Sequence, residues 1–297
     1  MGPRTAGRWK SADVTHRKAI LFQALAAVLF STGGLLIKIV SIEPLALMGV
    51  RSAIAALVIG LFMGRPRFVW SVPQLGGAIA LAAAQGFFIF ANRETTAANA
   101  IFIQYTAPVF VAFFGILYLR EPVRKLDWFS LAAIGAGLLF FYGDGLTAHG
   151  ATGNLYALLA GISFAWFLLF MRKQKDASTI ETVFLGNILA AILGLPFLRE
   201  AAPSAVDWAG MLALGIFQIG FPFILVALAI KKLTAVGAVL IQALEPILSP
   251  IWVVLFIGEA PTPLAFLGGA IVIGAVTLRS VLTTRTHRVQ PASQPTT

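Results

Sequence analysis

Runs of about twenty apolar residues alternate with short polar connections along almost the whole chain. A helix needs about 20 mostly apolar residues to cross the hydrocarbon core of a bilayer, so each run predicts a membrane-spanning helix. The pattern predicts ten helices, over residues 19–39, 44–63, 73–91, 96–118, 126–142, 153–171, 180–198, 207–229, 233–257 and 263–282. We therefore expect an all-α polytopic membrane protein without a large soluble domain.

The fourth and ninth predicted helices share a polar pattern. Residues 96–121 read TAANAIFIQYTAPVFVAFFGILYLRE, and residues 234–259 read TAVGAVLIQALEPILSPIWVVLFIGE. The shared residues stand 138 positions apart (242 minus 104, for example): Thr96 and Thr234, Gln104 and Gln242, Pro108 and Pro246, Glu121 and Glu259. This constant offset predicts an internal repeat. The first five-helix copy covers residues 19–142 and the second covers residues 153–282, between tails 1–18 and 283–297.

The basic residues predict the orientation. If the N-terminus is inside, 18 of the 22 lysines and arginines lie in the tails and inner connections. Only Lys38, Arg93 and Arg199 fall outside, and Arg51 lies within a span. Lysine and arginine are concentrated on the cytoplasmic side of membrane proteins, so both termini are predicted to be cytoplasmic. Because five is odd, the two repeats enter the membrane from opposite sides, an arrangement that places substrate sites near the midplane.

The composition supports this class and excludes others. The chain of 297 residues is 59% hydrophobic and 11% charged, whereas soluble domains carry about a quarter charged residues. It has no cysteine, which excludes disulfides and thiolate metal sites. The net charge of +10 follows from membrane topology, so no nucleic-acid partner is expected. We expect no cofactor and no metal site.

The ten spans and the repeated glutamine–proline pattern give the chain a specific resemblance. With Arg51, seven residues after Pro44, and the glycines of the fifth and tenth helices, the chain resembles the drug/metabolite transporter superfamily with paired EamA-type domains. The resemblance covers residues 19–280. It implies a multi-pass protein of the cell inner membrane, similar to bacterial exporters of amino acids, including aromatic ones.

Three glutamines stand four residues before a proline: Gln104, Gln218 and Gln242. A helical proline cannot donate to the carbonyl four residues back, so each glutamine's backbone carbonyl is freed. Beside an amide side chain, that carbonyl suits a polar substrate. For Gln104 and Gln242 the recurrence favours a cavity role. For Gln218 a simple kink with a contact to a neighbouring helix is the preferred interpretation.

Glu245 is predicted to be the carboxylate deepest in the bilayer. Acidic residues are costly there and are usually functional, as substrate or proton sites. A structural ion pair with Arg51 is the alternative, and the sequence leaves both open, although the polar neighbours Gln242 and Pro246 favour a transport role. Lys38, the other candidate coupling charge, lies near a helix end, where snorkelling to water explains it.

Most aromatic residues are expected to pack or to face lipid. The mid-span residues Tyr105, Tyr156 and Trp166 are candidates for the cavity wall, because a buried phenol or indole needs a polar partner.

The sequence favours a secondary exporter of small metabolites, with amino acids as the leading substrate, working by alternating access within the lipid bilayer. A passive facilitator or channel and a multidrug exporter of cationic compounds remain alternatives. An intramembrane enzyme is disfavoured because His16, His149 and His287 all fall in loops or tails, so no catalytic residue is predicted. The oligomeric state is left open, with a monomer as one alternative.

Overall fold

The computed structural model describes residues 14–33, 36–37, 40–95, 97–142, 150–177, 179–200, 202–257 and 263–289. All regular elements in these ranges are helical. They are α1 (His16–Ser31), α3 (Pro44–Met63), α4 (Val72–Glu94), α5 (Ala97–Gln104), α6 (Ala107–Phe114), η2 (Gly115–Leu119), α7 (Lys125–Tyr142), α8 (Ala151–Lys173), α9 (Thr179–Gly194), η4 (Leu195–Glu200), α10 (Ala205–Ala213), η5 (Leu214–Gly220), α11 (Phe221–Ala229), α12 (Ala235–Gln242), α13 (Leu244–Ile257) and α14 (Pro263–Val289). Segments η2 and η5 are π-helical, and η4 is a 3₁₀ helix.

Six helical stretches in the described residues are long and apolar enough to cross a membrane. They are Pro44–Met63, Val72–Glu94, Ala100–Leu119, Ala151–Lys173, Thr179–Arg199 and Ala205–Ala229, and the shorter apolar helices Ala235–Ser249 and Leu267–Leu282 accompany them. The prediction of an all-helical, multi-pass membrane protein is confirmed. The number of ten spans and the side of the termini remain predictions.

Three of the predicted spans are interrupted near their middle. Residues 96–118 divide into α5, α6 and η2, residues 207–229 into α10, η5 and α11, and residues 233–257 into α12 and α13. In each case a proline lies in the first turn of the α-helix that follows: Pro108, Pro222 and Pro246. Since proline lacks an N–H, these are the places where the helical ladder is most easily broken. The predicted spans remain helical stretches over Ala100–Leu119, Ala205–Ala229 and Ala235–Ser249, and each has a turn or a π-helical segment near its middle.

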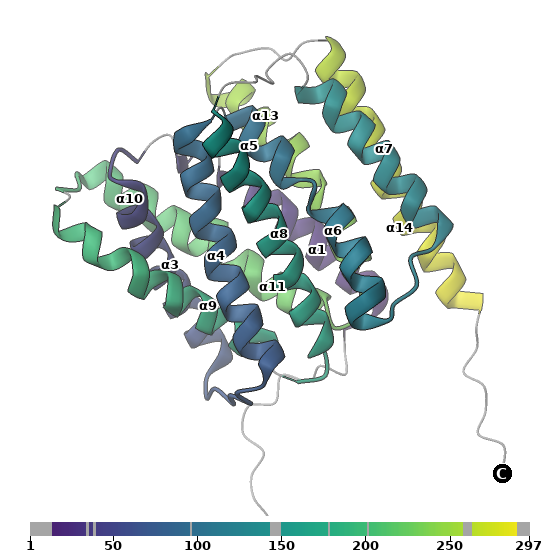
Figure 1. The fold of residues 1–297 in the computed structure, drawn as a ribbon, viewed down its shortest axis with the longest axis horizontal. Helices are drawn as coiled ribbons and strands as arrows, with labels where there is room; N and C mark the ends of the chain where they lie inside the picture. The colour runs from purple at the N-terminus through teal and green to yellow at the C-terminus, as the bar shows by residue number, and fades with distance from the viewer. Residues whose placement is uncertain are drawn as a thin grey trace, which may run out of the picture.

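The two parts of the chain interlock helix by helix (Figure 1). Helix α4 runs along α8 and α9, α3 runs along α9, α1 packs on α11, and α6 meets α12. Helices α7 and α14 run side by side at one edge of the molecule. Each of these pairs joins an element before residue 143 to an element after residue 150, so the space between the two parts lies at the centre of the bundle.

Polar contacts tie together one end of the bundle. Arg172 Nε lies 2.6 Å from Glu121 Oε1, and Arg172 also donates to the carbonyl of Ile230 at 3.2 Å. At the same end, Arg279 Nε lies 2.7 Å from Asp127 Oδ1, an ion pair in which both side chains are buried. Burial lowers the pKa of the nearby Lys231, although the negative charges of Glu181 and Asp176 act to raise it. This end carries the connections that the basic residues assign to the cytoplasmic side.

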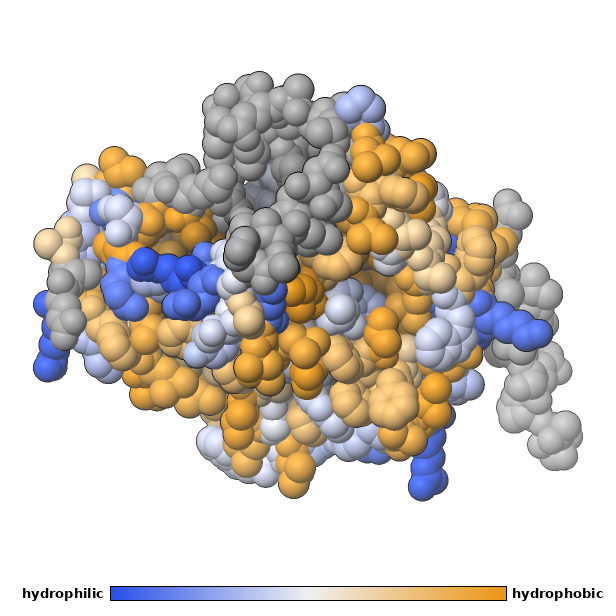
Figure 2. Space-filling view, turned by 45° about the horizontal axis from the view of Figure 1, so that its top comes forward, coloured by the Kyte–Doolittle hydropathy of each residue, from blue (hydrophilic) through white to orange (hydrophobic). Residues whose placement is uncertain are grey.

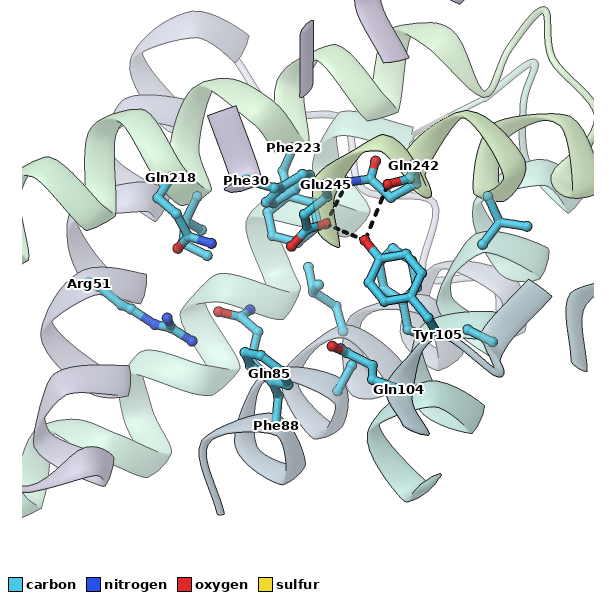
Figure 3. Close-up of a pocket in the computed structure, with 16 residues that line it drawn as sticks. Phe30, Arg51, Gln85, Phe88, Gln104, Tyr105, Gln218, Phe223, Gln242 and Glu245 are labelled. Carbon is cyan, nitrogen blue, oxygen red and sulfur yellow. Dashed lines mark hydrogen bonds between the residues drawn. The ribbon is translucent and has the colours of Figure 1, made fainter. Parts of the chain in front are cut away.

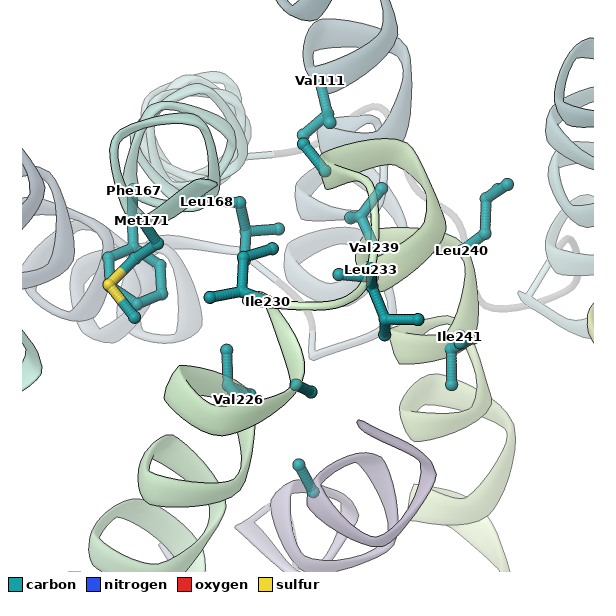
Figure 4. Close-up of a cluster of buried hydrophobic side chains, with 14 of the residues drawn as sticks. Val111, Phe167, Leu168, Met171, Val226, Ile230, Leu233, Val239, Leu240 and Ile241 are labelled. Carbon is teal, nitrogen blue, oxygen red and sulfur yellow. The ribbon is translucent and has the colours of Figure 1, made fainter. Parts of the chain in front are cut away.

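The buried core and the outer surface are both apolar. Side chains from α8, from the end of α11 and the turn after it, and from α12 pack in one large cluster that includes Phe167, Leu168, Ile230 and Leu240 (Figure 4). The helices also present many large apolar side chains outward, for example Leu57, which is 64% exposed, so that hydrophobic residues cover much of the visible surface (Figure 2). Such extensive exposed apolar surface fits contact with lipid.

Candidate substrate site

A cavity of about 90 Å³ lies between the two parts of the chain (Figure 3). Residues from both parts line it: Phe30, Arg51, Leu81, Ala84, Gln85, Phe88, Gln104, Tyr105, Ala107, Phe164, Gln218, Ile219, Phe223, Val239, Gln242 and Glu245. A cavity of this size with polar lining holds several water molecules or a small polar solute.

Two of the broken helices end at this cavity. The first break exposes Gln104 and Tyr105 between α5 and α6, and the second exposes Gln242 at the end of α12 and Glu245 in the first turn of α13. A carboxylate near a helix N-terminus is favoured by the positive end of the helix dipole. Discontinuous helices of this kind form the substrate sites of many transporters.

The carboxylate of Glu245 is held by two side chains. Tyr105 donates its hydroxyl hydrogen to Oε2 at 2.8 Å, and Gln242 donates from Nε2 to the same oxygen at 2.8 Å. The Tyr105 hydroxyl also lies 3.2 Å from the backbone carbonyl of Gln242, the group that Pro246 cannot engage. The second oxygen, Oε1, accepts no hydrogen bond from the described residues. Glu245 is therefore fixed in place with one oxygen left for a ligand.

A second amide completes this network. Gln23 of α1 donates from Nε2 to Oε1 of Gln242 at 2.8 Å, and Gln242 in turn donates a hydrogen bond from its Nε2 to Oε2 of Glu245. The amide orientation of Gln242 is set by this contact, because a carboxylate oxygen only accepts. The chain of donors runs from Gln23 to Gln242 to Glu245, so the amide of Gln242 is held with its Nε2 towards the carboxylate.

The opposite side of the cavity carries donors without partners. Arg51 of α3 is 3% exposed, and its Nε has no hydrogen-bond partner among the described residues. Gln85 of α4 is 7% exposed and its Nε2 is equally without one, although its Oε1 lies 3.4 Å from the Ser52 hydroxyl. A buried polar group left unsatisfied costs about 1–3 kcal/mol, and more when charged. Both groups are hydrogen-bond donors of cavity-lining residues that have no acceptor among the described residues.

Arg51 and Glu245 face the same cavity without forming an ion pair. The ion pairs within the described residues join Arg172 to Glu121 and Arg279 to Asp127, and neither includes these two. Figure 3 shows Arg51 on the side away from Glu245, with Gln85 labelled between them. Arg51 and Glu245 are therefore separated by the cavity and do not form a structural ion pair.

The remaining wall is apolar and largely aromatic. Phe30, Phe88, Phe164 and Phe223 line the cavity, and Phe30 meets Phe223 edge to face with ring centroids 4.9 Å apart. Phenyl rings around few polar groups are typical of small-molecule sites. The aliphatic part of a small polar solute would contact these rings.

Four of the six predicted substrate residues line the cavity, together with Arg51, while the other two lie elsewhere. Trp166 packs in an aromatic cluster with Phe114, Tyr118 and Phe170. Tyr156 packs against Phe87 and Phe90. Neither belongs to the cavity lining, because their faces of α8 are turned to other helices. Lys38 lies outside the described residues.

Three further amides belong to the site or its network. The sequence pattern does not predict Gln23 and Gln85, although each is a polar residue in the middle of an apolar helix. The sequence favours a simple kink at Gln218, whereas the structure places its side chain in the cavity wall.

Membrane-crossing helices, broken at a central cavity with a cation and an anion facing each other, define a membrane transporter. Comparison with known families agrees: the model of the EamA-like transporter family matches residues 17–143 and again residues 151–281. The chain belongs to this family, within the drug/metabolite transporter superfamily, and is a transporter of small molecules rather than an enzyme.

Several individual proteins are similar to the chain. The threonine/homoserine exporter RhtA of Escherichia coli (strain K12) is 27% identical over 219 residues, 72% of each chain. The uncharacterized transporter YxxF of Bacillus subtilis (strain 168) is 24% identical over 282 residues, 89% of each chain. A protein of known crystal structure superposes with a TM-score of 0.78 over 92% of this chain and 99% of its own, at 22% identity. This last likeness shows the shared fold.

Proposed function

We propose that the protein is a secondary exporter of small zwitterionic amino acids across the cell inner membrane. One observation carries the proposal: Arg51 and Glu245 line one cavity, and among the described residues Nε of Arg51 has no hydrogen-bond partner and Oε1 of Glu245 accepts no hydrogen bond. An amino acid has the complementary pair of charges, a carboxylate for Arg51 and Gln85 and an ammonium group for Glu245.

The size of the cavity favours small side chains. A volume of about 90 Å³ suits an amino acid with a short side chain better than an aromatic one, although the phenyl rings would tolerate apolar atoms. The relatives support amino acids as the substrate class, because the similar protein of Escherichia coli is a threonine/homoserine exporter. We therefore place small amino acids first and aromatic ones second.

Transport is proposed to proceed by alternating access in ten spans arranged as two inverted five-helix repeats. The helix pairs support this arrangement: α1 with α11 and α8 with α4 correspond under an exchange of the two repeats, and α6 with α12 and α7 with α14 correspond to themselves. The two matches of the family model also support it. Inverted repeats suit rocking of one half against the other around a central site.

The orientation is tested by a reporter fused after Thr297. We expect a cytoplasmic signal, because Arg279, Arg285 and Arg288 follow the apolar part of the last helix. A signal from the outer side would overturn the predicted side of the C-terminus and, if the N-terminus is inside, the even number of spans.

The substrate class is tested with purified protein in liposomes. Vesicles loaded with an unlabelled amino acid should accumulate the same labelled amino acid by exchange, and a panel of small, aromatic and cationic solutes ranks the substrates. We expect small zwitterions to exchange fastest, and an imposed pH gradient reports whether protons are coupled to them. Exchange of cationic drugs but of no amino acid would contradict the proposal.

A further inference from the structure

A second cavity, of about 280 Å³, has no part in the proposed charge pairing. Its lining comes from the residues that precede α3, from the first turns of α3 and from the last turns of α4. Phe88 of α4 lines this cavity and also the central one, where Figure 3 shows it next to Gln85. The two cavities are therefore adjacent, with Phe88 in the wall of each.

The second cavity lies at the end of the bundle opposite Arg172. Helices α4 and α8 run antiparallel: a Cβ on Gly76, in the first turns of α4, would lie 2.7 Å from Cζ of Phe170, whereas Thr95, just after α4, donates to Oδ1 of Asn154 at 2.9 Å. The end of α4 that lines the cavity thus meets the start of α8, and Arg172 is in the last turn of α8. In the predicted orientation this is the outer end, where an exported solute is released.

Three polar side chains line the second cavity: Ser41, Asn92 and Arg93. Asn92 donates from Nδ2 to the backbone carbonyl of Phe88 at 2.8 Å, which fixes the amide, and its Oδ1 accepts no hydrogen bond from the described residues. Arg93 is exposed and forms no ion pair within the described part of the chain. The cavity therefore offers a donor for a carboxylate and, one residue away, an acceptor for an ammonium group.

A buried carboxylate holds the wall of this cavity in place. Asp207 of α10 is 3% exposed, and its Oδ1 accepts from the backbone N–H of Ser41 at 2.7 Å and from the Ser41 hydroxyl at 3.0 Å. Its Oδ2 accepts from the N–H and the hydroxyl of Ser204 at 2.8 and 2.7 Å. The connection before α3 is thus tied to the second part of the chain, so the cavity has a preformed wall.

We propose that this cavity is a second binding site for the transported solute, where the carboxylate meets Arg93 and the ammonium group meets Oδ1 of Asn92 before release. The inference rests on the proposed function, because it takes the ligand to be a small zwitterion. A guanidinium forms charge-assisted, often bidentate hydrogen bonds with a carboxylate. Since Arg93 is exposed, water screens this contact, and the second site binds more weakly than a buried one.

A single thiol in the second cavity tests this site, because the natural chain has no cysteine. Ile42→Cys places the thiol in the apolar part of the lining. Purified protein in detergent is treated with a small water-soluble thiol reagent, with alanine, threonine and leucine added in turn as ligands. The thiol should react, and the amino acids should slow the reaction.

Three further variants assign this protection to a site. It should persist in Ile42→Cys/Glu245→Gln, in which the central cavity has lost its carboxylate. In Ile42→Cys/Arg93→Gln the amino-acid concentration that gives half-protection should rise about threefold to fivefold. Ile42→Cys/Arg199→Gln is the matched control, because Arg199 is exposed and lies outside the cavity lining, and it should leave half-protection unchanged.

The outcomes separate this inference from the proposed function. Protection that disappears in Ile42→Cys/Glu245→Gln would come from the central cavity alone and would overturn the second site. An unreactive thiol, or half-protection that Arg93→Gln does not change, would overturn it as well. Missing protection alongside amino-acid exchange in liposomes would overturn this inference only. If the liposomes exchange no amino acid, the proposed function falls with it.

Discussion

The hydroxyl of Tyr105 donates a 2.8 Å hydrogen bond to Oε2 of Glu245 and so joins the broken helix of the first repeat to that of the second. Tyr105 follows α5 directly, and Glu245 lies in the first turn of α13. The bond crosses the cavity wall at the point where both repeats interrupt their helices. A substrate ammonium group at Glu245 would therefore be sensed by both repeats.

Tyr105→Phe should impair transport without unfolding the protein. A hydrogen bond to a charged group contributes about 1.5–3 kcal/mol, so its loss should weaken substrate affinity about tenfold or more. The measurement is concentration-dependent exchange in liposomes. Tyr156→Phe is the matched control, because Tyr156 packs on Phe87 and Phe90 outside the cavity and should exchange normally. Equal effects of the two changes would argue against the Tyr105–Glu245 contact as part of the site.

Glu245→Gln should yield folded protein that no longer transports. Glu245 has no ion-pair partner among the described residues, so neutralising it strands no buried cation. The yield of monodisperse protein and its thermal midpoint should stay near those of the unmodified chain, while exchange is lost. If Glu245→Gln and Arg51→Gln instead both lowered the yield and the double variant restored it, the two residues would form a structural pair, at a cost of about 3–5 kcal/mol when broken.

The ion pair between Arg279 and Asp127 is expected to serve stability. Both side chains are buried, and Asp127→Asn would leave Arg279 without its partner, lowering the free energy of unfolding by about 3–5 kcal/mol. Thermal unfolding in detergent measures this, with Asp127→Asn/Arg279→Gln expected to recover part of the loss. Arg65→Gln, at an exposed position, provides the control. An unchanged midpoint for Asp127→Asn would mean that the pair contributes nothing.

Cysteine substitution tests whether Gln104 and Gln242 share one water-accessible cavity. The natural chain has no cysteine, so Gln104→Cys and Gln242→Cys each introduce a single thiol. Both should react with small water-soluble reagents and be protected by substrate, whereas Ala165→Cys in the fully buried core should not react. Inert thiols at both cavity positions in every transport condition would favour simple contacts between helices.

The polar pattern of the sequence was sufficient to predict part of this site. A glutamine four residues before a proline marks a freed carbonyl, and that rule located Gln104 and Gln242 because it is local to one helix. The placement of Trp166 and Tyr156 depends on which face of α8 meets which neighbour, and a uniformly apolar helix does not record this. Gln218 lies in a π-helical segment that packs against α3, whereas a turn follows Gln104 and Gln242. The same glutamine–proline spacing therefore occurs with two different backbone irregularities.

The breaks within the predicted spans show the same limit. Hydropathy detects a run of apolar residues but not where its helix becomes irregular, so the pattern over residues 96–118 and 233–257 does not predict the turns at Tyr105 and Ala243. The prolines indicated where a break was most probable. Contacts between the two parts of the chain, such as the hydrogen bond from Tyr105 to Glu245, fix how the end of α5 and the start of α13 lie relative to each other.

The central claim is that a zwitterion lies between Arg51 and Glu245, and competition by substrate analogues with one charge removed tests it most directly. The probe is the best-exchanged amino acid of the panel, with its carboxamide and its N-acetyl form as competitors. The unmodified protein should bind both analogues at least about tenfold more weakly than the parent. A tenfold difference in affinity corresponds to about 1.4 kcal/mol of binding free energy. Arg51→Gln should lose only the preference over the carboxamide, and Glu245→Gln only the preference over the N-acetyl form. Analogues that compete as well as the parent, or variants that weaken all three compounds equally, would contradict the account.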